Sequence, residues 1–292
     1  MTLVIGASGF LGSYLLRELL RRSEGDIIAA SRSGTAFVKD DKVHPLAFDV
    51  TDRVQIKSLA RRVSVVEDLT VYYLAAMHHP DAVEKDPALA HQINVEALAR
   101  FLSGIENIAR LYYTSSDTVY GEGSAAYRFG ESDPLNPINE YGRSKARAEQ
   151  VALEKGYNIF RFPLLNGPSL TPGKNHFYDI VAQALTAGKQ FMMFTDYVRS
   201  ALDYATAARL MVSVDLCGKD VPKVLNISGD KALSKYDIGL MIAQKTGADS
   251  SLVIPGSSAQ QGAFEARRAN TILMDNSRVK SLLESAEIQL QF

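Results

Sequence analysis

Two side chains with complementary proton chemistry, Tyr141 and Lys145, lie one helical turn apart in this sequence. Residues at positions i and i+4 share one face of a helix, so we expect the phenol and the ammonium group to lie side by side. The ammonium charge favours tyrosinate and should lower the phenol pKa from its ordinary value of about 10. A phenol tuned in this way can exchange a proton with an oxygen atom at neutral pH. Ser116 is the third candidate, because its hydroxyl can hydrogen-bond that oxygen and orient it.

A glycine-rich stretch follows a short apolar run at the start of the chain. Gly6 would permit a tight turn, Gly9 would let the backbone approach a pyrophosphate, and Gly12 would let a helix pack close to the preceding strand. Anionic oxygens would then meet the free N–H groups of the helix N-terminus. The spacing departs from the commoner Gly-x-Gly-x-x-Gly, and a plain strand-to-helix turn is the alternative. In this context the stretch predicts a dinucleotide site with contacts from Gly6, Ser8, Gly9, Phe10, Leu11 and Gly12.

The choice of dinucleotide depends on the end of the second predicted strand. NAD sites usually place an acidic residue there for the ribose hydroxyls, whereas this chain has Ser31 and Arg32. A guanidinium group and hydroxyls favour the additional phosphate of NADP, with NAD as the alternative and a solvated Arg32 as the plain interpretation. The remaining predicted cofactor contacts follow later strands and a helix: Asp49, Val50, Leu74, Ala75, Ala76, Asn94, Ser115 and Pro163.

Short apolar runs alternate with helical patterns through the first half of the chain. This alternation predicts a parallel sheet with right-handed crossovers, covered by helices on both faces. The second half is less regular. The expected strands are 3–5, 26–30, 43–48, 71–74, 111–113, 158–162 and 224–227; the expected helices are 10–22, 54–62, 88–108, 141–155, 177–187, 205–214 and 235–246, with a long loop over 166–175.

Composition excludes several classes of function. The 292 residues carry a formal net charge of −1, which gives no bulk attraction to nucleic acid or to an anionic membrane. The single cysteine, Cys217, rules out an intrachain disulfide, and no apolar run approaches the roughly 18 residues of a membrane span. We therefore expect a cytoplasmic protein. His78 and His79 lack a completing ligand set, so we expect no metal site, and His78 is a candidate substrate contact.

Together these motifs resemble the extended short-chain dehydrogenase/reductase family over nearly the whole chain. The resemblance rests on the stretches 6–12, 74–76, 94–95, 115–121 and 141–145, together with Arg161. It implies an α/β fold, a doubly wound parallel Rossmann sheet with a smaller C-terminal substrate-binding lobe. It divides the chain into residues 1–163, the dinucleotide-binding domain, and residues 164–292, mainly the lobe, with the two interleaved. It also implies catalytic roles for Ser116, Tyr141 and Lys145, and a homodimer.

Within this family the chain looks most like dTDP-4-dehydrorhamnose reductases, on the stretches 127–145, 199–204 and 267–277. That likeness implies reduction of a nucleotide-activated keto sugar by NAD(P)H, with a hydride from the nicotinamide and a proton from Tyr141. Two departures fall on the substrate side, where Leu164 replaces the group's tryptophan and Arg267-Arg268 replaces its Arg-Pro. An epimerase and a non-catalytic regulatory homologue therefore remain alternatives. The predicted substrate contacts are His78, Asp117, Asn166, Arg199 and Arg267.

Asp117 also separates the chain from a neighbouring group. Sugar-nucleotide 4,6-dehydratases carry Asp-Glu at this place, while here Asp117 is followed by Thr118. The second carboxylate that water loss would need is missing, and simple reduction does not require it.

Overall fold

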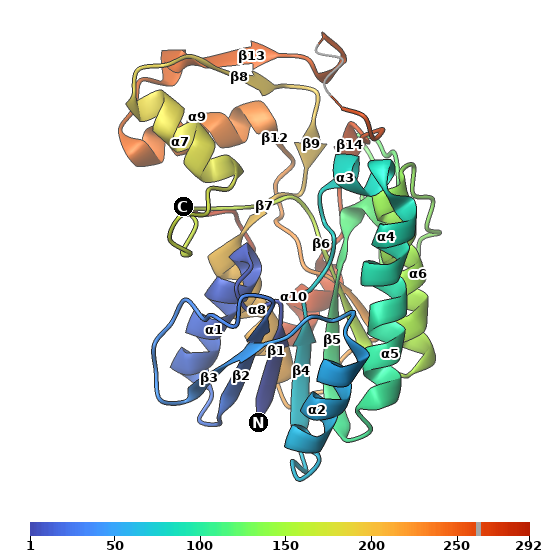
Figure 1. Ribbon diagram of the computed structural model, residues 1–292. Coiled ribbons are helices and arrows are strands. Elements are labelled where there is room, and N and C mark those ends of the chain that lie inside the picture. The colour runs from blue at the N-terminus through green and yellow to red at the C-terminus, as the bar shows by residue number, and fades with distance from the viewer. Residues whose placement is uncertain (261–263) are drawn as a thin grey trace.

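The computed structural model describes residues 1–260 and 264–292, and its centre is a parallel seven-stranded sheet (Figure 1). The strand order is β11-β6-β5-β4-β1-β2-β3, so the order reverses between β1 and β4. This is the doubly wound Rossmann arrangement, which confirms the predicted fold class. The strands are β1 (Thr2–Ile5), β2 (Ile27–Ser31), β3 (Val43–Ala47), β4 (Leu69–Tyr73), β5 (Ile108–Ser116), β6 (Asn158–Phe162) and β11 (Val224–Asn226).

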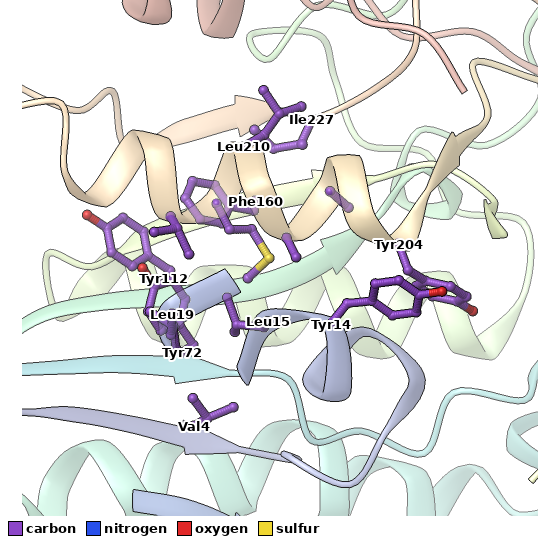
Figure 2. Packing of buried hydrophobic residues seen from close by; sticks show 14 of the residues in the cluster. Val4, Tyr14, Leu15, Leu19, Tyr72, Tyr112, Phe160, Tyr204, Leu210 and Ile227 are labelled. Carbon is purple, nitrogen blue, oxygen red and sulfur yellow. The ribbon is translucent and has the colours of Figure 1, made fainter. Parts of the chain in front are cut away.

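Helices cover both faces of this sheet (Figure 1). Because successive side chains of a strand point to opposite faces, neighbouring tyrosines enter different layers. Tyr72 and Tyr112 stack at 5.3 Å in the layer shared with α1 and α8 (Figure 2), whereas Tyr73 and Tyr113 pack in the opposite layer. The first layer is covered by α1 (Phe10–Arg22), α8 (Tyr204–Asp215) and α10 (Ser277–Leu283), the second by α2 (Arg53–Val63), α4 (Pro87–His91), α5 (Ala97–Gly104) and α6 (Glu140–Glu154).

The helix expected over 88–108 is shorter and less regular than its pattern predicted. A π-helical turn, Gln92–Glu96, separates α4 from α5, and the helix ends at Gly104. Ile105 is already extended, and the amide of Asn107 donates to the carbonyls of Val63 and Val66. These bonds fix the turn that leads into β5. A further short helix, α3 (Pro80–Lys85), begins at the proline after β4.

The remaining elements form a smaller lobe above the sheet in Figure 1. Its core lies between α7, α9 and a β8–β13 pair. Ser234 caps α9 reciprocally with Asp237, and Gly247 ends it in a left-handed conformation, so this helix has the predicted boundaries. The lobe elements are α7 (Phe177–Thr186), α9 (Lys235–Thr246), β7 (Leu165–Asn166), β8 (Phe191–Phe194), β9 (Val198–Arg199), β10 (Leu202–Asp203), β12 (Leu233–Ser234), β13 (Val253–Gly256) and β14 (Thr271–Ile272).

The chain passes between sheet and lobe more than once. After β6 it enters the lobe, returns to the sheet through α8 and β11, forms α9, and ends with α10 against α8 and β11. The predicted boundary after Pro163, between a dinucleotide-binding domain and a substrate-binding lobe, therefore stays a prediction about function. No helix among the described residues is long and apolar enough to span a membrane.

Candidate functional site

The glycine loop joins β1 to α1 with the close contacts that its sequence predicts. Gly6 has a φ of 92°, and a Cβ there would lie 3.0 Å from the backbone nitrogen of Ala75. A Cβ on Gly12 would lie 2.4 Å from the carbonyl oxygen of Gly6, so only glycine lets α1 approach β1 this closely. Gly9 is the N-cap and no side chain caps the helix. The first N–H groups of α1 are therefore available to an anionic ligand.

A cavity of about 1150 Å³ opens at this loop, at the carboxyl ends of β1 and β4. Doubly wound folds bind their ligands at such a switch point. The structure brings most of the predicted residues together in its walls: Gly6, Ser8, Gly9, Phe10, Leu11, Gly12, Ser31, Arg32, Asp49, Val50, Leu74, Ala75, Ala76, His78, Ser115, Ser116, Asp117, Tyr141, Lys145, Pro163 and Arg199.

Local packing places Tyr141 and Lys145 beside the end of β5. The side chain of Asn139 accepts from the N–H of Gly142 and starts α6 just before Tyr141. A Cβ on Gly142 would lie 2.6 Å from the carbonyl oxygen of Thr118, so glycine allows the helix to approach the segment after β5. Ser116 is the last residue of β5 and faces the same cavity.

The electrostatics of this pair differ from the prediction. Burial raises the pKa of the Tyr141 phenol, the charge of Asp117 adds to this, and a hydrogen bond with Ser116 opposes it. The Lys145 ammonium donates to the carbonyl of Thr114 at 2.5 Å and lies 4.3 Å from the centre of the Tyr113 ring. Burial lowers the pKa of Lys145 to about 7. The prediction that lysine lowers the phenol pKa is therefore wrong for this structure, because the ammonium lies against β5 and both groups are desolvated.

A neutral phenol is the form that can donate a proton. With its pKa raised, Tyr141 keeps its proton throughout the neutral range. The arrangement therefore suits protonation of an oxygen atom better than removal of a proton from one.

Ser116 is tied to a buried ion pair that crosses from the sheet to the lobe. Its hydroxyl donates to Oδ1 of Asp117 at 3.1 Å, and Oδ2 of Asp117 lies 3.2 Å from Nε of Arg199. Arg199 is only 2% exposed, and its other nitrogens donate to the carbonyls of Val198, Ala269 and Asn270. We expected Arg199 to bind a substrate phosphate. Arg199 lines the cavity, but its guanidinium group also pairs with Asp117 inside the protein, where it offsets the burial that raises the pKa of Asp117; its contact with a substrate stays a prediction.

Asn94 and Asn166 were expected at the ligand, and neither lines the cavity. The amide of Asn94 accepts from the N–H of Met77 at 2.7 Å and donates to its carbonyl at 3.1 Å, so it holds the backbone after β4. Asn166 is fully buried, and its side chain accepts from the N–H of Gly167. The amide of Asn94 is thus satisfied mainly by backbone, as is usual for buried amides, whereas the buried Nδ2 of Asn166 has no hydrogen-bond partner among the described residues.

Arg267 is the third predicted residue that the structure leaves outside the cavity. Its side chain is exposed, and only its carbonyl takes part in a described contact, with the amide of Asn139. The neighbouring Arg268 instead forms an ion pair with Asp81 at 2.9 Å. The Arg267-Arg268 pair thus fastens this segment to α3 and α6.

Sequence reasoning missed several cavity residues from the long loop and the lobe. Lys174 donates to the carbonyl of Ser8 at 3.0 Å, which brings the loop onto the glycine turn. The His176 ring lies 4.5 Å from that of Phe10 and 5.5 Å from that of Tyr204. Burial lowers the pKa of His176 to about 4, so this imidazole is neutral. No periodic pattern in the sequence links these distant residues. The one sequence signal of such a contact is Phe10, the aromatic residue inside the glycine-rich stretch.

The end of the cavity near β2 and β3 has two different walls. Ser31 is buried and donates to the carbonyl of Thr35. Arg32 is exposed at the cavity edge and has no ion pair among the residues that the structure describes. Two hydrogen bonds from Thr51 lower the pKa of Asp49, which keeps this carboxylate charged beside the cavity. Within the described part of the chain, no group of three or more His, Cys, Asp and Glu residues could hold a metal ion.

Comparison with known proteins agrees with this architecture. Residues 1–289 match the family model described as the RmlD substrate binding domain. Methionine adenosyltransferase 2 subunit beta of Bos taurus is 25% identical over 96% of this chain and 81% of its own length. The probable low-salt glycan biosynthesis reductase Agl14 of Haloferax volcanii is 27% identical over 86% of this chain and 81% of its own length. The solved dTDP-4-dehydrorhamnose reductase of Bacillus anthracis, in complex with NADP, superimposes with a TM-score of 0.80 at 21% identity, covering 99% of this chain and 94% of that one.

Proposed function

The chain belongs to the RmlD substrate binding domain family, and from this premise we propose that it is an NADP-dependent reductase of a nucleotide-activated keto sugar. The main support for this proposal is a single cavity that extends from a turn that only glycine permits to a protonated phenol. That cavity reaches from Gly6 and Gly12 to Ser116 and Tyr141. Two of the similar proteins described above are named as reductases, which agrees with this proposal.

The residues present fit a dinucleotide. A side chain at Gly12 would collide with the backbone of Gly6, and α1 begins without a side-chain cap, so backbone N–H groups face the cavity. The buried hydroxyl of Ser115 has no hydrogen-bond partner among the described residues, so it is free to meet a ligand. Bound NAD(P)H would supply a hydride to the carbonyl carbon of the substrate. Arg32 is free to pair with the additional phosphate of NADP, which favours that cofactor over NAD.

The chain's own residues would complete the reduction as follows. Ser116 would turn its hydroxyl from Asp117 toward the substrate carbonyl and hold that oxygen near Tyr141. Tyr141 would give its proton to that oxygen, and the product would be an alcohol. Lys145 would stay against β5, where it donates to the carbonyl of Thr114. Proton and hydride together account for the two hydrogens that the product gains.

The proposal is tested with a panel of keto-sugar nucleotides and NADPH, following cofactor fluorescence. Tyr141→Phe should still bind NADPH, because the phenol oxygen is the only atom removed. Its turnover should fall by about two or more orders of magnitude, as expected when a general acid is lost. Tyr127→Phe, a partly exposed phenol outside the cavity, is the matched control. Equal turnover of Tyr141→Phe and the wild-type protein would contradict the proposed role.

Two other functions remain as candidates. The similarity to a subunit of methionine adenosyltransferase favours a non-catalytic homologue that binds a dinucleotide. Binding of NADPH without turnover across the whole panel would support that interpretation. An epimerase would instead retain its cofactor through purification and interconvert sugar nucleotides without consuming NADPH.

A further inference from the structure

An ammonium group surrounded by aromatic rings lies where α9 meets β9. Lys235 is the first residue of α9, and its backbone N–H donates to the carbonyl of Tyr197 at 3.1 Å. Its Nζ lies 4.7 Å from the ring centre of Tyr197, 5.2 Å from that of Phe177, 5.5 Å from that of Phe194 and 5.8 Å from that of Phe264. The rings attract the cation through their faces, but they bring no negative charge to it.

The charges around Lys235 do not balance. Arg199 pairs with Asp117 at 3.2 Å, and Arg268 pairs with Asp81 at 2.9 Å. Lys235 has no carboxylate within ion-pair distance among the described residues. Three cations therefore share two carboxylates. Burial and the two guanidinium charges lower the pKa of Lys235 to about 8, which reflects a cation without a counter-ion.

This cluster adjoins the cavity of the proposed active site. Tyr197 and Arg199, both in contact with the cluster, line the same cavity as Tyr141. They belong to the lobe segment that contains β9. Lys235 does not itself line the cavity, and its ammonium lies next to it, beside the ring of Tyr197. A ligand that extends from Tyr141 toward the lobe would therefore approach Lys235 past Tyr197.

We propose that Lys235 binds a phosphate-class anion carried by the substrate, a contact that deepens the proposed function and rests on it. A lysine ammonium binds phosphate oxygens as a point charge, and the low-dielectric surroundings strengthen the attraction. The aromatic rings restrict where the ammonium can move, so it is already positioned when the anion arrives. In this proposal Lys235 binds the substrate phosphate that the sequence analysis assigned to Arg199, because the charge of Arg199 is already paired with that of Asp117.

Calorimetric titration with inorganic pyrophosphate tests the site without turnover. NADP is present throughout so that the glycine turn is occupied. Lys235→Met should weaken pyrophosphate binding about tenfold or more, the usual loss for a charge-assisted hydrogen bond, while Lys235→Arg should stay within about threefold. Lys245→Met, an exposed lysine of the same helix, is the control and should bind as the wild type does. Equal affinity of Lys235→Met and the wild type would overturn the proposal.

If Lys235→Met folds poorly, pyrophosphate affinity measured at several pH values in the wild type and in Lys235→Arg gives a second test. The ratio of wild-type to Lys235→Arg affinity cancels the titration of pyrophosphate itself. Arg199 and Arg268 stay charged in both proteins, and the Tyr197 phenol and the Asp237 carboxylate near the helix start are common to both. The ratio should fall about fivefold or more from pH 7 to pH 9 as the lysine alone loses its proton. A ratio that stays constant up to pH 11, above the ordinary lysine pKa of about 10.4, would overturn the proposal.

Nucleotides then identify the source of the anion. UDP and dTDP should each bind more tightly than uridine and thymidine, and Lys235→Met should remove most of that difference. Pyrophosphate binding that depends on Lys235, without such a difference, would overturn the assignment to the substrate. These readouts need no keto sugar, so a failure of the proposed reduction would leave them to stand or fall separately.

Discussion

Lys145 gives the sharpest quantitative prediction, because a fully desolvated lysine makes stability depend on pH. Its pKa falls from an ordinary value of 10.5 to about 7 in the folded protein, through burial. The unfolded chain therefore binds more protons between these two values. Stability must rise with pH across this window, and the lysine's penalty is fully present below about pH 7.

The size of the effect follows from the shift. Each pH unit inside the window is worth about 1.4 kcal/mol, so raising the pH from 7 to 9 should relieve the penalty by about 2 kcal/mol. Lys145→Met removes the titrating group and its penalty together. Between pH 7 and pH 9, the free energy of unfolding should therefore rise by about 2 kcal/mol more in the wild type than in Lys145→Met.

Denaturant unfolding at pH 7, 8 and 9 measures this difference. The comparison with Lys145→Met cancels other titrations, including that of Lys235, whose pKa is also lowered. Lys155→Met, an exposed lysine just beyond the end of the same helix, should follow the wild type in parallel. If the wild type and Lys145→Met also run parallel, Lys145 is not desolvated and the reasoning about its site fails.

Two further predictions concern the cofactor and the buried ion pair. Arg32→Ala should raise the NADPH dissociation constant about tenfold and leave that of NADH unchanged, since only NADPH carries the additional phosphate; fluorescence titration measures both, and an unchanged ratio would contradict the cofactor assignment. Arg199→Met should reduce the free energy of unfolding by about 3 to 5 kcal/mol, because it leaves the Asp117 carboxylate buried and unpaired, and adding Asp117→Asn should recover part of the loss. Denaturant unfolding decides this, and a loss below about 1 kcal/mol would show that the pair is not desolvated.

The sequence predicted those parts of the fold that depend on local patterns. The boundaries of α1 and α9 followed from helical patterns in the sequence, and the structure shows that a capping box and a terminal glycine fix those of α9. The helix expected up to residue 108 was wrong at its end, because Asn107 satisfies carbonyls of a distant turn. Such a bond has no signature in the local sequence.

The site could be predicted only as far as its motifs extend along the chain. The glycine turn and the pair Tyr141 and Lys145 were predicted from spacing, and Ser116 from its place after the fifth strand and from the family resemblance, whereas the electrostatic environment was not predicted. Spacing places a lysine and a tyrosine on one face of a helix, but burial determines their pKa values, and burial depends on the whole fold. The same limit explains why Arg199 was expected to be free while Lys235 was not considered.

The buried pair of Asp117 and Arg199 connects the lobe to the proton chemistry. Arg199 belongs to β9, and its guanidinium also holds the carbonyls of Ala269 and Asn270, so its position depends on how the lobe segments pack. Asp117 in turn accepts the hydroxyl proton of Ser116. A shift of the lobe that strengthens the ion pair would weaken the hold of Asp117 on that proton, since the guanidinium group competes for the carboxylate charge. Ser116 would then be freer to donate to another oxygen atom, such as that of the carbonyl substrate that we propose.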